Sequence, residues 1–392
     1  MTDACPTLFS PLVLGPVTLK NRIVMAPLTR QMAEPDGTPT DEMAAYYARR
    51  ARGGLGMIIT EGTYEQDGWQ SKAYLSQPGI ATDAHVAGWK KVVDAVHAHD
   101  CKIIVQLMHG GRVCDPRCLN GEPPVSASAT HSGGWVLYTD TDYEKNIRAI
   151  DGPWPKVTFG PARALRVDDI HAIADGFAAG AARAVAAGAD GVEVHGANGY
   201  LLWQFINPKT NLRTDDFGGS PENNIRFAKL VGDKIRAAIG PGKLIVLRLS
   251  QDGVDDFTGA WPGVAYAEAI GAALKGSAYD ALHWASFDYA ANRQTDSAEP
   301  MPAALRRTSG LPMIANGGIF DGATAETALT SGAADAVAIG RAIFAHPDWA
   351  YIVRSGMPYD WMPFDRKYVI RPPLDYGLAY PLALTDPKWP AP

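Results

Sequence analysis

Residues 191–200 read Gly191-Val192-Glu193-Val194-His195-Gly196-Ala197-Asn198-Gly199-Tyr200, a short apolar run that ends in glycines and polar side chains. The run Leu244-Ile245-Val246-Leu247-Arg248-Leu249 has the same character. Both runs are apolar at nearly every position rather than at alternate positions, which is typical of parallel strands that are buried on both faces. The two runs therefore predict a parallel sheet that is covered by helices.

Similar runs recur along the whole chain, with helix patterns between them. The predicted strands are Arg22–Ala26, Met57–Glu61, Lys102–Leu107, Gly191–His195, Leu244–Leu249, Ala281–Ala285, Pro312–Ala315 and Ala336–Ile339. One helix is expected over Asp83–His99, and another is expected to begin at Ser220-Pro221-Glu222 and to end near Ala238, before Gly240. This α/β alternation predicts a (β/α)8 TIM barrel, with a doubly wound open sheet as the competing architecture.

The chain has 392 residues, whereas about 250 are typical of such a barrel. The extra length falls into three segments. Leu8–Asn21 is expected to form an N-terminal hairpin across the bottom of the barrel. Residues 110–166 form a long insertion after the third strand, and residues 357–392 an irregular tail rich in Pro and Tyr. We expect one barrel domain over residues 1–392.

The composition excludes several classes of protein. The formal net charge is −6, with 36 basic and 42 acidic residues, which disfavours a nucleic-acid-binding protein. No run approaches the roughly 18 apolar residues of a membrane span, and no signal-peptide pattern is visible. The four cysteines are too few for a disulfide framework, and no second close pair follows Cys114 and Cys118, so we expect free thiols, no metal site and a cytoplasmic location.

Polar residues stand where the predicted strands end, which is where the active site of such a barrel lies. Pro27 and Thr29 follow the first strand, Gly62 follows the second, and Gln106 lies within the third. Each of these signals also fits a simple strand-end turn. The buried amide of Gln106 needs partners on both its donor and its acceptor side, so it either serves the core or binds one edge of a ligand.

The fourth and fifth strands carry the most informative residues. His195 and Asn198 can both donate to one substrate oxygen, and Tyr200 follows with a phenol whose ordinary pKa is about 10, which suits it to giving up a proton. A capped turn with a packing tyrosine is the alternative. Arg248 lies among aliphatic residues, and a lone buried charge is costly. Its partner is therefore an internal carboxylate or an anionic ligand.

The last two strands run into Gly317 and Gly318, and into Gly340 and Arg341. Backbone N–H groups at helix N-termini together with an arginine suit a phosphate. No G-x-G-x-x-G motif follows a strand, so a ligand with a single phosphate fits better than a dinucleotide.

These residues together resemble the Old Yellow Enzyme family, the FMN-dependent ene-reductases. The most specific block runs from His195 to Arg226 and reads HGANGYLLWQFINPKTNLRTDDFGGSPENNIR. Further matches are Pro27-Leu28-Thr29, Val105-Gln106-Leu107 followed by His109 and Arg112, and Gly340-Arg341. The resemblance extends from about Leu8 to about Val353.

The resemblance implies tightly but non-covalently bound FMN, with NADPH or NADH as the reductant. Hydride would pass through FMN to the β-carbon of electron-poor alkenes such as enones, nitroalkenes and maleimides. His195 and Asn198 would bind the substrate oxygen, and Tyr200 would protonate the α-carbon. The expected partners are these small molecules alone, without nucleic acid or membrane, and the expected state is a monomer or homodimer.

The resemblance also implies how the strand ends bind FMN. Thr29 would bond flavin O4, the backbone at Pro27 and Gly62 would lie along the ring system, Gln106 would pair with the pyrimidine edge, and Arg248 would lie near N1. The phosphate would be held by Gly317, Gly318, Gly340 and Arg341.

Two positions distinguish this chain within the family. Met108 stands where relatives commonly have tryptophan, so we expect a pocket that accepts bulkier substrates. Thr29 stands where another subgroup has cysteine, which indicates the classical branch. Tyr74 matches a tyrosine that lines the substrate pocket in relatives, and the tail residues Tyr376-Gly377 are expected near the flavin.

Two other functions stay open. A different FMN barrel, of the dienoyl-CoA reductase or amine dehydrogenase type, would commonly carry an iron–sulfur cysteine cluster and further C-terminal domains, and we expect neither in this protein. A non-catalytic barrel that binds flavin or another aromatic ligand is the second alternative. Turnover of a coenzyme with an alkene would separate it from an enzyme.

Overall fold

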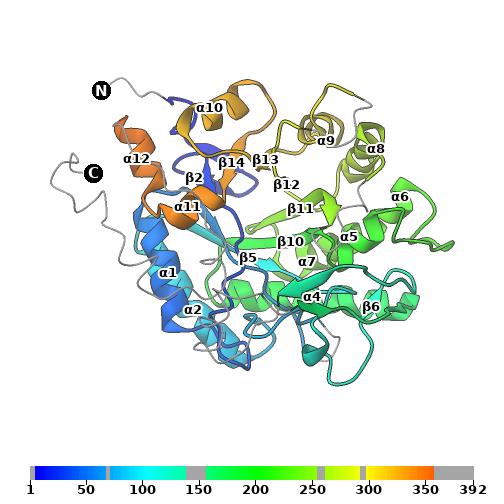
Figure 1. The fold of residues 1–392 in the computed structure, drawn as a ribbon. Coiled ribbons are helices and arrows are strands. Elements are labelled where there is room, and N and C mark those ends of the chain that lie inside the picture. The colour runs from blue at the N-terminus through cyan, green and yellow to red at the C-terminus, as the bar shows by residue number, and fades with distance from the viewer. Residues whose placement is uncertain (1–4, 68–70, 138–155, 254–260, 292–296, 357–392) are drawn as a thin grey trace.

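The barrel closes through hydrogen bonds between its last and first strands. A computed structural model describes residues 5–67, 71–137, 156–253, 261–291 and 297–356. The barrel strands are β3 (Ile23–Met25), β4 (Met57–Ile59), β5 (Lys102–Leu107), β10 (Gly191–Asn198), β11 (Leu244–Gly253), β12 (Ala281–Ala285), β13 (Met313–Asn316) and β14 (Ala336–Ile339). All neighbours run parallel, and β14 pairs with β3 (Figure 1). This closure confirms the (β/α)8 barrel and excludes the open sheet.

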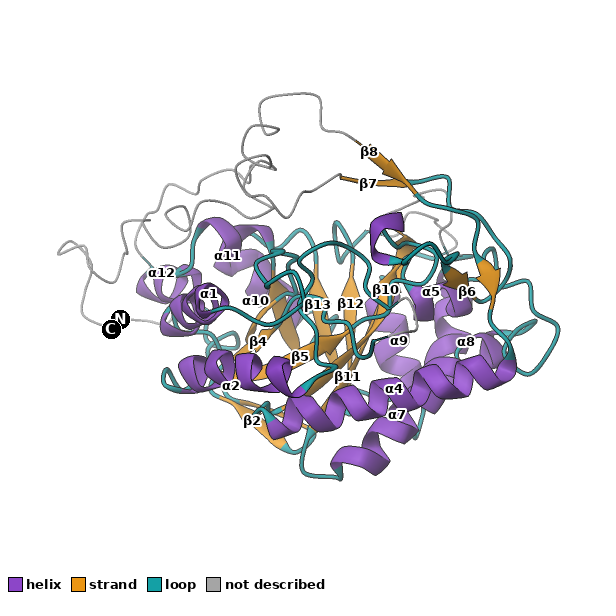
Figure 2. Cartoon of the chain, turned by 90° about the horizontal axis from the view of Figure 1, so that it is seen from below, coloured by secondary structure: helices purple, strands orange, loops and turns teal. Residues whose placement is uncertain are grey.

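Helices surround the barrel, with the strands inside (Figure 2). They are α1 (Asp41–Arg52), α2 (Asp83–His97), α4 (Val167–Ala186), α5 (Leu201–Ile206), α6 (Pro221–Asn224), α7 (Arg226–Ile239), α8 (Val264–Leu274), α9 (Met301–Ser309), α10 (Gly322–Thr330), α11 (Arg341–Ala345) and α12 (Trp349–Ser355). The predicted helix over Asp83–His99 therefore ends two residues early, at a cap formed by Ala98.

The helix predicted from Ser220 is wrong in one respect, because it is divided at Ile225 into α6 and α7. Its ends are confirmed: Ser220 Oγ accepts from the backbone N–H of Asn223 at 3.3 Å, and Gly240 has φ 72°. The division follows from Asn224, which is buried and donates its amide to Tyr266 Oη at 2.8 Å. That contact joins α6 to α8.

Successive residues of a barrel strand point to opposite faces, and the core follows this alternation. Leu244 and Val246 of β11 pack inside the barrel, while Ile245 and Leu247 pack outward against helices. The interior cluster also contains Leu14, Val17 and Leu19 of the hairpin formed by β1 (Leu12–Leu14) and β2 (Val17–Leu19). The predicted plug is therefore confirmed, and it gives the barrel an apolar floor.

The insertion after β5 contains more regular structure than its irregular composition suggests. It holds a 3₁₀ turn η1 (Pro116–Cys118) and two short strand pairs: β6 (Val125–Ser126) with β9 (Arg163–Ala164), and β7 (Trp135–Leu137) with β8 (Lys156–Thr158). Figure 2 shows β7 and β8 beyond the end of the barrel opposite β2. Residues 138–155 and the tail 357–392, with Tyr376 and Gly377, lie outside the described residues.

A buried ion pair joins α1 to the start of α12. Arg49 donates to both carboxylate oxygens of Asp348, at 2.6 and 2.8 Å, and the two side chains are 7% and 5% exposed. Breaking a buried pair leaves an uncompensated charge, which costs more than the intact pair contributes.

We expect Asp348→Ala to lower the free energy of unfolding by about 3–5 kcal/mol, because the Arg49 guanidinium would stay buried without its carboxylate. Urea unfolding followed by circular dichroism measures the change. The control is Asp94→Ala, which removes an exposed pair with Lys90 and should cost less than about 1 kcal/mol. Equal losses in the two variants would contradict the prediction.

Candidate active site

A layer of polar side chains lies directly above the apolar floor of the barrel. Gln106, Glu193, Arg248 and His283 come from β5, β10, β11 and β12, and each is at most 6% exposed. Arg248 lies two residues after the interior residue Val246, and His283 two residues after the interior residue Ala281, so both point inward. In register, Glu193 pairs with Gln106, and Arg248 with His283.

Glu193 is the centre of this layer. Gln106 Nε2 donates to Glu193 Oε1 at 2.7 Å, and His283 Nδ1 lies 2.7 Å from Glu193 Oε2. Glu193 and His283 were not recognised from the sequence as site residues, whereas Gln106 was. The available signal was a polar side chain at an interior position of an otherwise apolar run, which is the same signal that identified Arg248.

Arg248 has no direct carboxylate partner within the described residues. Its Nη2 donates to Asn316 Oδ1 at 3.4 Å, and its buried Nε has no hydrogen-bond partner in that part of the chain. Burial lowers the pKa of Arg248, and the nearby Glu193 and Tyr200 oppose that shift. Of the two partners that the sequence left open, the internal carboxylate is therefore not in bonding contact within the described residues.

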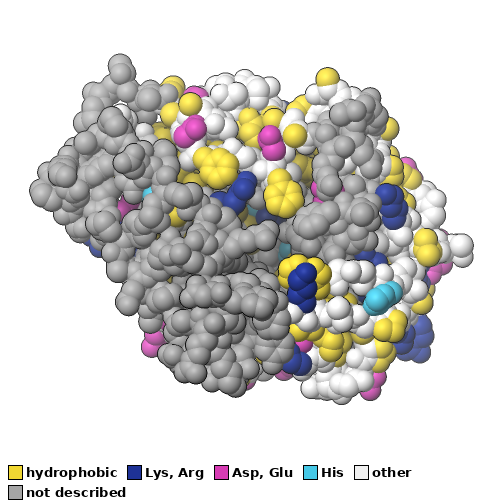
Figure 3. All heavy atoms as spheres, viewed as in Figure 1, with side chains coloured by type: hydrophobic (Ala, Val, Ile, Leu, Met, Phe, Trp, Pro, Cys, Tyr) yellow, Lys and Arg dark blue, Asp and Glu magenta, His cyan; other side chains and the backbone are white. Residues whose placement is uncertain are grey.

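One cavity, of about 190 Å³, brings together most of the predicted cofactor residues. Its lining includes Pro27, Arg248, Gly317, Gly318, Gly340 and Arg341, together with Ser286, Phe287, Asn316 and Phe320, which were not predicted. Arg341 lies over the Phe320 ring at 4.8 Å. Hydrophobic and basic side chains lie next to one another at the centre of the face shown in Figure 3.

Two glycines shape this cavity. Gly317 has φ 124°, and an added Cβ would lie 2.3 Å from the carbonyl oxygen of Ser286, so no side chain fits there. At Gly340 an added Cβ would find its nearest neighbours at 3.7–3.8 Å and would project into the cavity that the residue lines. Gly317 is thus required by the close approach of the Ser286 backbone, whereas Gly340 leaves space in the wall of the cavity.

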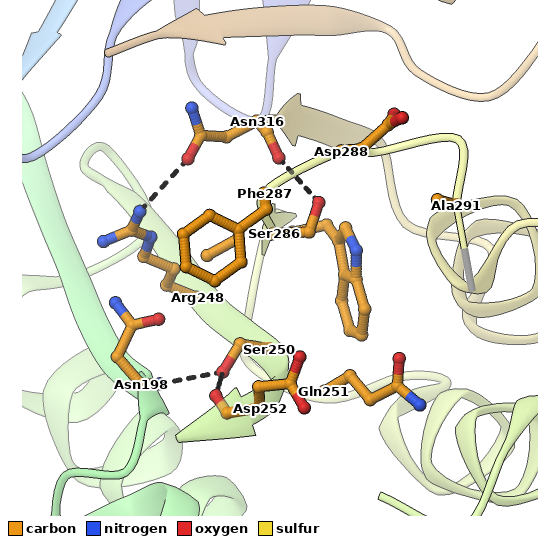
Figure 4. Close-up of a pocket in the computed structure, with 12 residues that line it drawn as sticks. Asn198, Arg248, Ser250, Gln251, Asp252, Ser286, Phe287, Asp288, Ala291 and Asn316 are labelled. Carbon is orange, nitrogen blue, oxygen red and sulfur yellow. Dashed lines mark hydrogen bonds between the residues drawn. The ribbon is translucent and has the colours of Figure 1, made fainter. Parts of the chain in front are cut away.

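A second cavity, of about 230 Å³, adjoins the first and contains Asn198 (Figure 4). The two cavities share Arg248, Ser286, Phe287 and Asn316. Asn198 follows a bulge in β10, has φ 59°, and donates its backbone N–H to Ser250 Oγ at 2.8 Å. In Figure 4 its side chain lies beside Arg248. The bulge therefore places the Asn198 amide at the cavity.

His195 and Tyr200 lie against each other, with ring centroids 5.0 Å apart. Burial lowers the pKa of His195 well below its usual 6.5, and the positive charge of Arg248 adds to this shift. His195 is therefore neutral at physiological pH and can donate one hydrogen bond without carrying charge. Tyr200 packs on a cluster that contains Tyr74 and Met108, which brings the predicted substrate residues to the predicted proton donor.

The remaining predicted cofactor residues form a wall beside this cluster. Tyr74 Oη lies 3.4 Å from Thr29 Oγ1 and donates to the carbonyl of Gly62 at 3.3 Å. A Cβ on Gly62 would lie 3.3 Å from Gln106 Oε1 and 2.3 Å from Met108 Sδ. Gly62 therefore permits the close packing that brings Thr29, Tyr74, Gln106 and Met108 together.

Glu61 holds the loop that carries Thr29, a role the sequence did not reveal. Its Oε2 accepts from the backbone N–H groups of Arg30 and Gln31 at 2.8 and 3.1 Å, and Tyr47 Oη donates to its other oxygen at 3.5 Å. Gln31 has φ 54°, an uncommon conformation that this carboxylate supports. Full burial raises the pKa of Glu61 to about 7.

FMN fits this arrangement. The mononucleotide has one phosphate, a flat apolar ring system and a pyrimidine edge of alternating donors and acceptors. The cavity offers the space at Gly340, and Arg248, which lines it, has a buried Nε without a partner among the described residues. Gln106 Oε1 lies toward Gly62, outside the lining of this cavity, and makes no hydrogen bond to the described residues. No cluster of three metal-ligating side chains and no helix apolar enough to cross a membrane occurs among the described residues.

The match to a family model extends over residues 7–360, and the family is the NADH:flavin oxidoreductase / NADH oxidase family. The chain belongs to this family. Membership confirms the predicted class of enzyme, an oxidoreductase that uses flavin, and the resemblance to Old Yellow Enzyme proteins.

Individual relatives agree with this assignment. The chain is 35% identical over 379 residues to chanoclavine-I aldehyde reductase of Penicillium roqueforti, covering 94% of this chain and 95% of that protein. It is 31% identical over 362 residues to NADH oxidase of Thermoanaerobacter brockii, where the match covers 90% of this chain but only 51% of the relative. A structure of morphinone reductase in complex with tetrahydroNAD superposes with a TM-score of 0.82 at 33% identity, covering 98% of this chain and 99% of that one.

Glu61 should make stability depend on pH in a defined direction. Because its folded pKa of about 7 lies above the ordinary 4.5, the folded state holds this proton more tightly than the unfolded state. The resulting stabilisation is complete below pH 4.5 and is lost as the pH rises through 7, by about 2–3 kcal/mol between pH 5 and 8. In Glu61→Gln the acceptor oxygen remains, but the side chain at this position no longer titrates. The free energy of unfolding of the variant should therefore rise relative to that of wild type between pH 5 and 8. Parallel pH curves would contradict this.

The low pKa of His195 gives a spectroscopic prediction. The ring signals of His195, assigned by their loss in His195→Gln, should not move between pH 6 and 8 in a ¹³C-histidine NMR titration of the protein. Burial and the positive charge of Arg248 disfavour the imidazolium form. A histidine-containing peptide measured alongside should titrate near pH 6.5. A His195 signal with the same midpoint as the peptide would show that the ring carries charge in the site.

Proposed function

We propose that the protein is an FMN-dependent ene-reductase that passes hydride from NADPH or NADH, through FMN, to the β-carbon of electron-poor alkenes. The observation that carries this proposal is the convergence around Arg248 of two features. One is the glycine-lined cavity, and the other is the group formed by His195, Asn198 and Tyr200. The chanoclavine-I aldehyde reductase and morphinone reductase relatives, each similar over almost their whole length, support it.

The described residues would hold FMN without a covalent bond. Arg248 and Gln106 would face the pyrimidine ring, and Thr29 with the backbone at Pro27 and Gly62 would line the flat ring system. The phosphate would contact the backbone and side chain of the residues at the last two strand ends, which are Gly317, Gly318, Gly340 and Arg341. Bound FMN supplies the hydride acceptor and donor that the chain itself lacks.

The chain's own residues supply polarisation and a proton. The neutral imidazole of His195 and the amide of Asn198 donate to the substrate carbonyl or nitro oxygen, where negative charge develops as hydride adds. Tyr200 holds the phenolic proton for the α-carbon. Burial raises the pKa of Tyr74 well above its usual 10, so this residue stays protonated as a donor within the wall of the pocket.

Met108 distinguishes the substrate range. It is 2% exposed and packs with Tyr74 below Tyr200. A thioether is smaller and more flexible than the indole common in relatives, so we propose that the pocket admits bulky enones, nitroalkenes or maleimides. We further propose that residues 1–392 form one FMN-binding barrel domain, active in the cytoplasm as a monomer or homodimer on small molecules, without nucleic acid or membrane.

Spectroscopy and turnover of the purified protein test the function. The protein should be yellow or become so with added FMN, and it should oxidise NADPH or NADH steadily when 2-cyclohexenone is present. Protein that stays colourless with FMN contradicts the proposal. Protein that binds FMN but turns over no coenzyme is instead the non-catalytic flavin binder.

Tyr200→Phe should separate the two half-reactions. The phenol acts only in the step that transfers a proton to the α-carbon. Its loss should therefore slow the reoxidation of the flavin by 2-cyclohexenone about 10²–10⁴-fold. The rate of flavin reduction by the coenzyme should stay within about twofold of wild type. Stopped-flow absorbance measures both steps. Tyr351→Phe on the outer helix α12 is the matched control and should change neither. A Tyr200→Phe enzyme that reduces the alkene at the wild-type rate would remove Tyr200 from the mechanism.

A further inference from the structure

Glu193 and His283 lie in the middle of the barrel, yet neither takes part in the proposed chemistry. Both side chains are fully buried, and the Glu193 carboxylate on β10 meets Gln106 on the adjacent strand β5 and His283 on β12, two strands away. A buried carboxylate is costly unless its oxygens accept hydrogen bonds. The two oxygens here are used separately, one by Gln106 and the other by His283, at 2.7 Å each.

The Glu193 carboxylate fixes the orientation of the Gln106 amide. A carboxylate only accepts hydrogen bonds, whereas a side-chain amide has a donor end and an acceptor end. Turning the Gln106 amide over would place two acceptor oxygens about 2.7 Å apart at buried positions. The nitrogen of Gln106 therefore faces Glu193, and its oxygen must face away, toward Gly62.

His283 keeps Glu193 in place. The contact to Glu193 Oε2 puts the imidazole proton on Nδ1, because the carboxylate can only accept. Gln106 is itself anchored, since its backbone N–H donates to Thr60 Oγ1 at 3.1 Å. Glu193 is thus held at both oxygens, and Gln106 is held at both its backbone and its amide nitrogen.

We propose that Glu193 is a positioning residue that makes Gln106 present an acceptor oxygen to FMN. This inference rests on the proposed function. The pyrimidine edge of flavin carries one donor, N3–H, between two carbonyl acceptors. An oxygen held toward the ligand pairs with N3–H, whereas an amide nitrogen held there would face only the carbonyls. Glu193 acts through Gln106 and touches neither substrate nor cofactor.

Glu193→Gln tests the inference, since glutamine has the same shape but can present either a donor or an acceptor to Gln106. We expect the dissociation constant for FMN, measured by fluorescence quenching with apoprotein, to rise several-fold, up to about tenfold, the value of one hydrogen bond. The N3–H signal of ¹⁵N-labelled FMN should move toward its position in free FMN. The control is Glu65→Gln, which changes another fully buried carboxylate whose oxygens have no hydrogen-bond partner in the described part of the chain. It should leave both readouts at wild-type values.

Exchanging the two side chains provides the second test. In the double variant Gln106→Glu with Glu193→Gln, the new amide donates to the new carboxylate and still accepts from His283 Nδ1. The other oxygen of the residue at 106 again faces the ligand as an acceptor. We expect this exchange to recover FMN affinity relative to Gln106→Glu alone, which places two carboxylates together.

The outcomes separate this inference from the proposed function. Wild-type protein that does not bind FMN removes the proposed function itself. If wild type binds FMN, then unchanged affinity and an unchanged N3–H signal in Glu193→Gln overturn the inference. Equal losses in Glu193→Gln and Glu65→Gln, or no recovery in the exchanged variant, show a general effect of replacing a buried carboxyl group and overturn it as well.

Discussion

A barrel whose interior excludes water can hold charged groups only where other groups satisfy them, and here the interaction that meets this condition is the carboxylate of Glu193 between Gln106 and His283. The alternation of each strand directs these side chains inward, and the apolar cluster below supports them. The mouth of the barrel is built directly on this layer. The orientation of the donors and acceptors in the site is therefore fixed by hydrogen-bonded side-chain pairs that lie deeper in the barrel.

The same layer sets the charge of the site. Glu193 is occupied by neutral partners, so the guanidinium of Arg248 faces the cavity without a carboxylate in contact. That positive charge, together with burial, keeps His195 neutral. The site therefore combines the buried cation of Arg248 with uncharged hydrogen-bond donors, which suits ligands that acquire negative charge during a reaction. These features agree with membership of the NADH:flavin oxidoreductase family.

Much of the fold could be predicted because buried parallel strands leave a strong local pattern. The apolar runs and the glycines at their ends identified the barrel, the plugging hairpin and the residues around the cavity. Glu193 and His283 could not be recognised as partners, because they are 90 residues apart in the chain and only the register of the strands joins them. Glu61 looked like the end of a strand, since nothing local shows that it accepts from the loop after β3. The division at Ile225 was missed because it depends on Asn224 meeting Tyr266 on α8.

The hairpin of β1 and β2 determines from which end of the barrel ligands can enter the site. It seals one end of the barrel with Leu14, Val17 and Leu19, so the cavities at Arg248 open at the other end. For the proposed reaction, coenzyme and alkene must then use the same entrance in turn, and each occupies the place the other needs. In such an enzyme the oxidised form binds the coenzyme and the reduced form binds the alkene, one after the other. A large excess of either molecule would then inhibit the binding of the other.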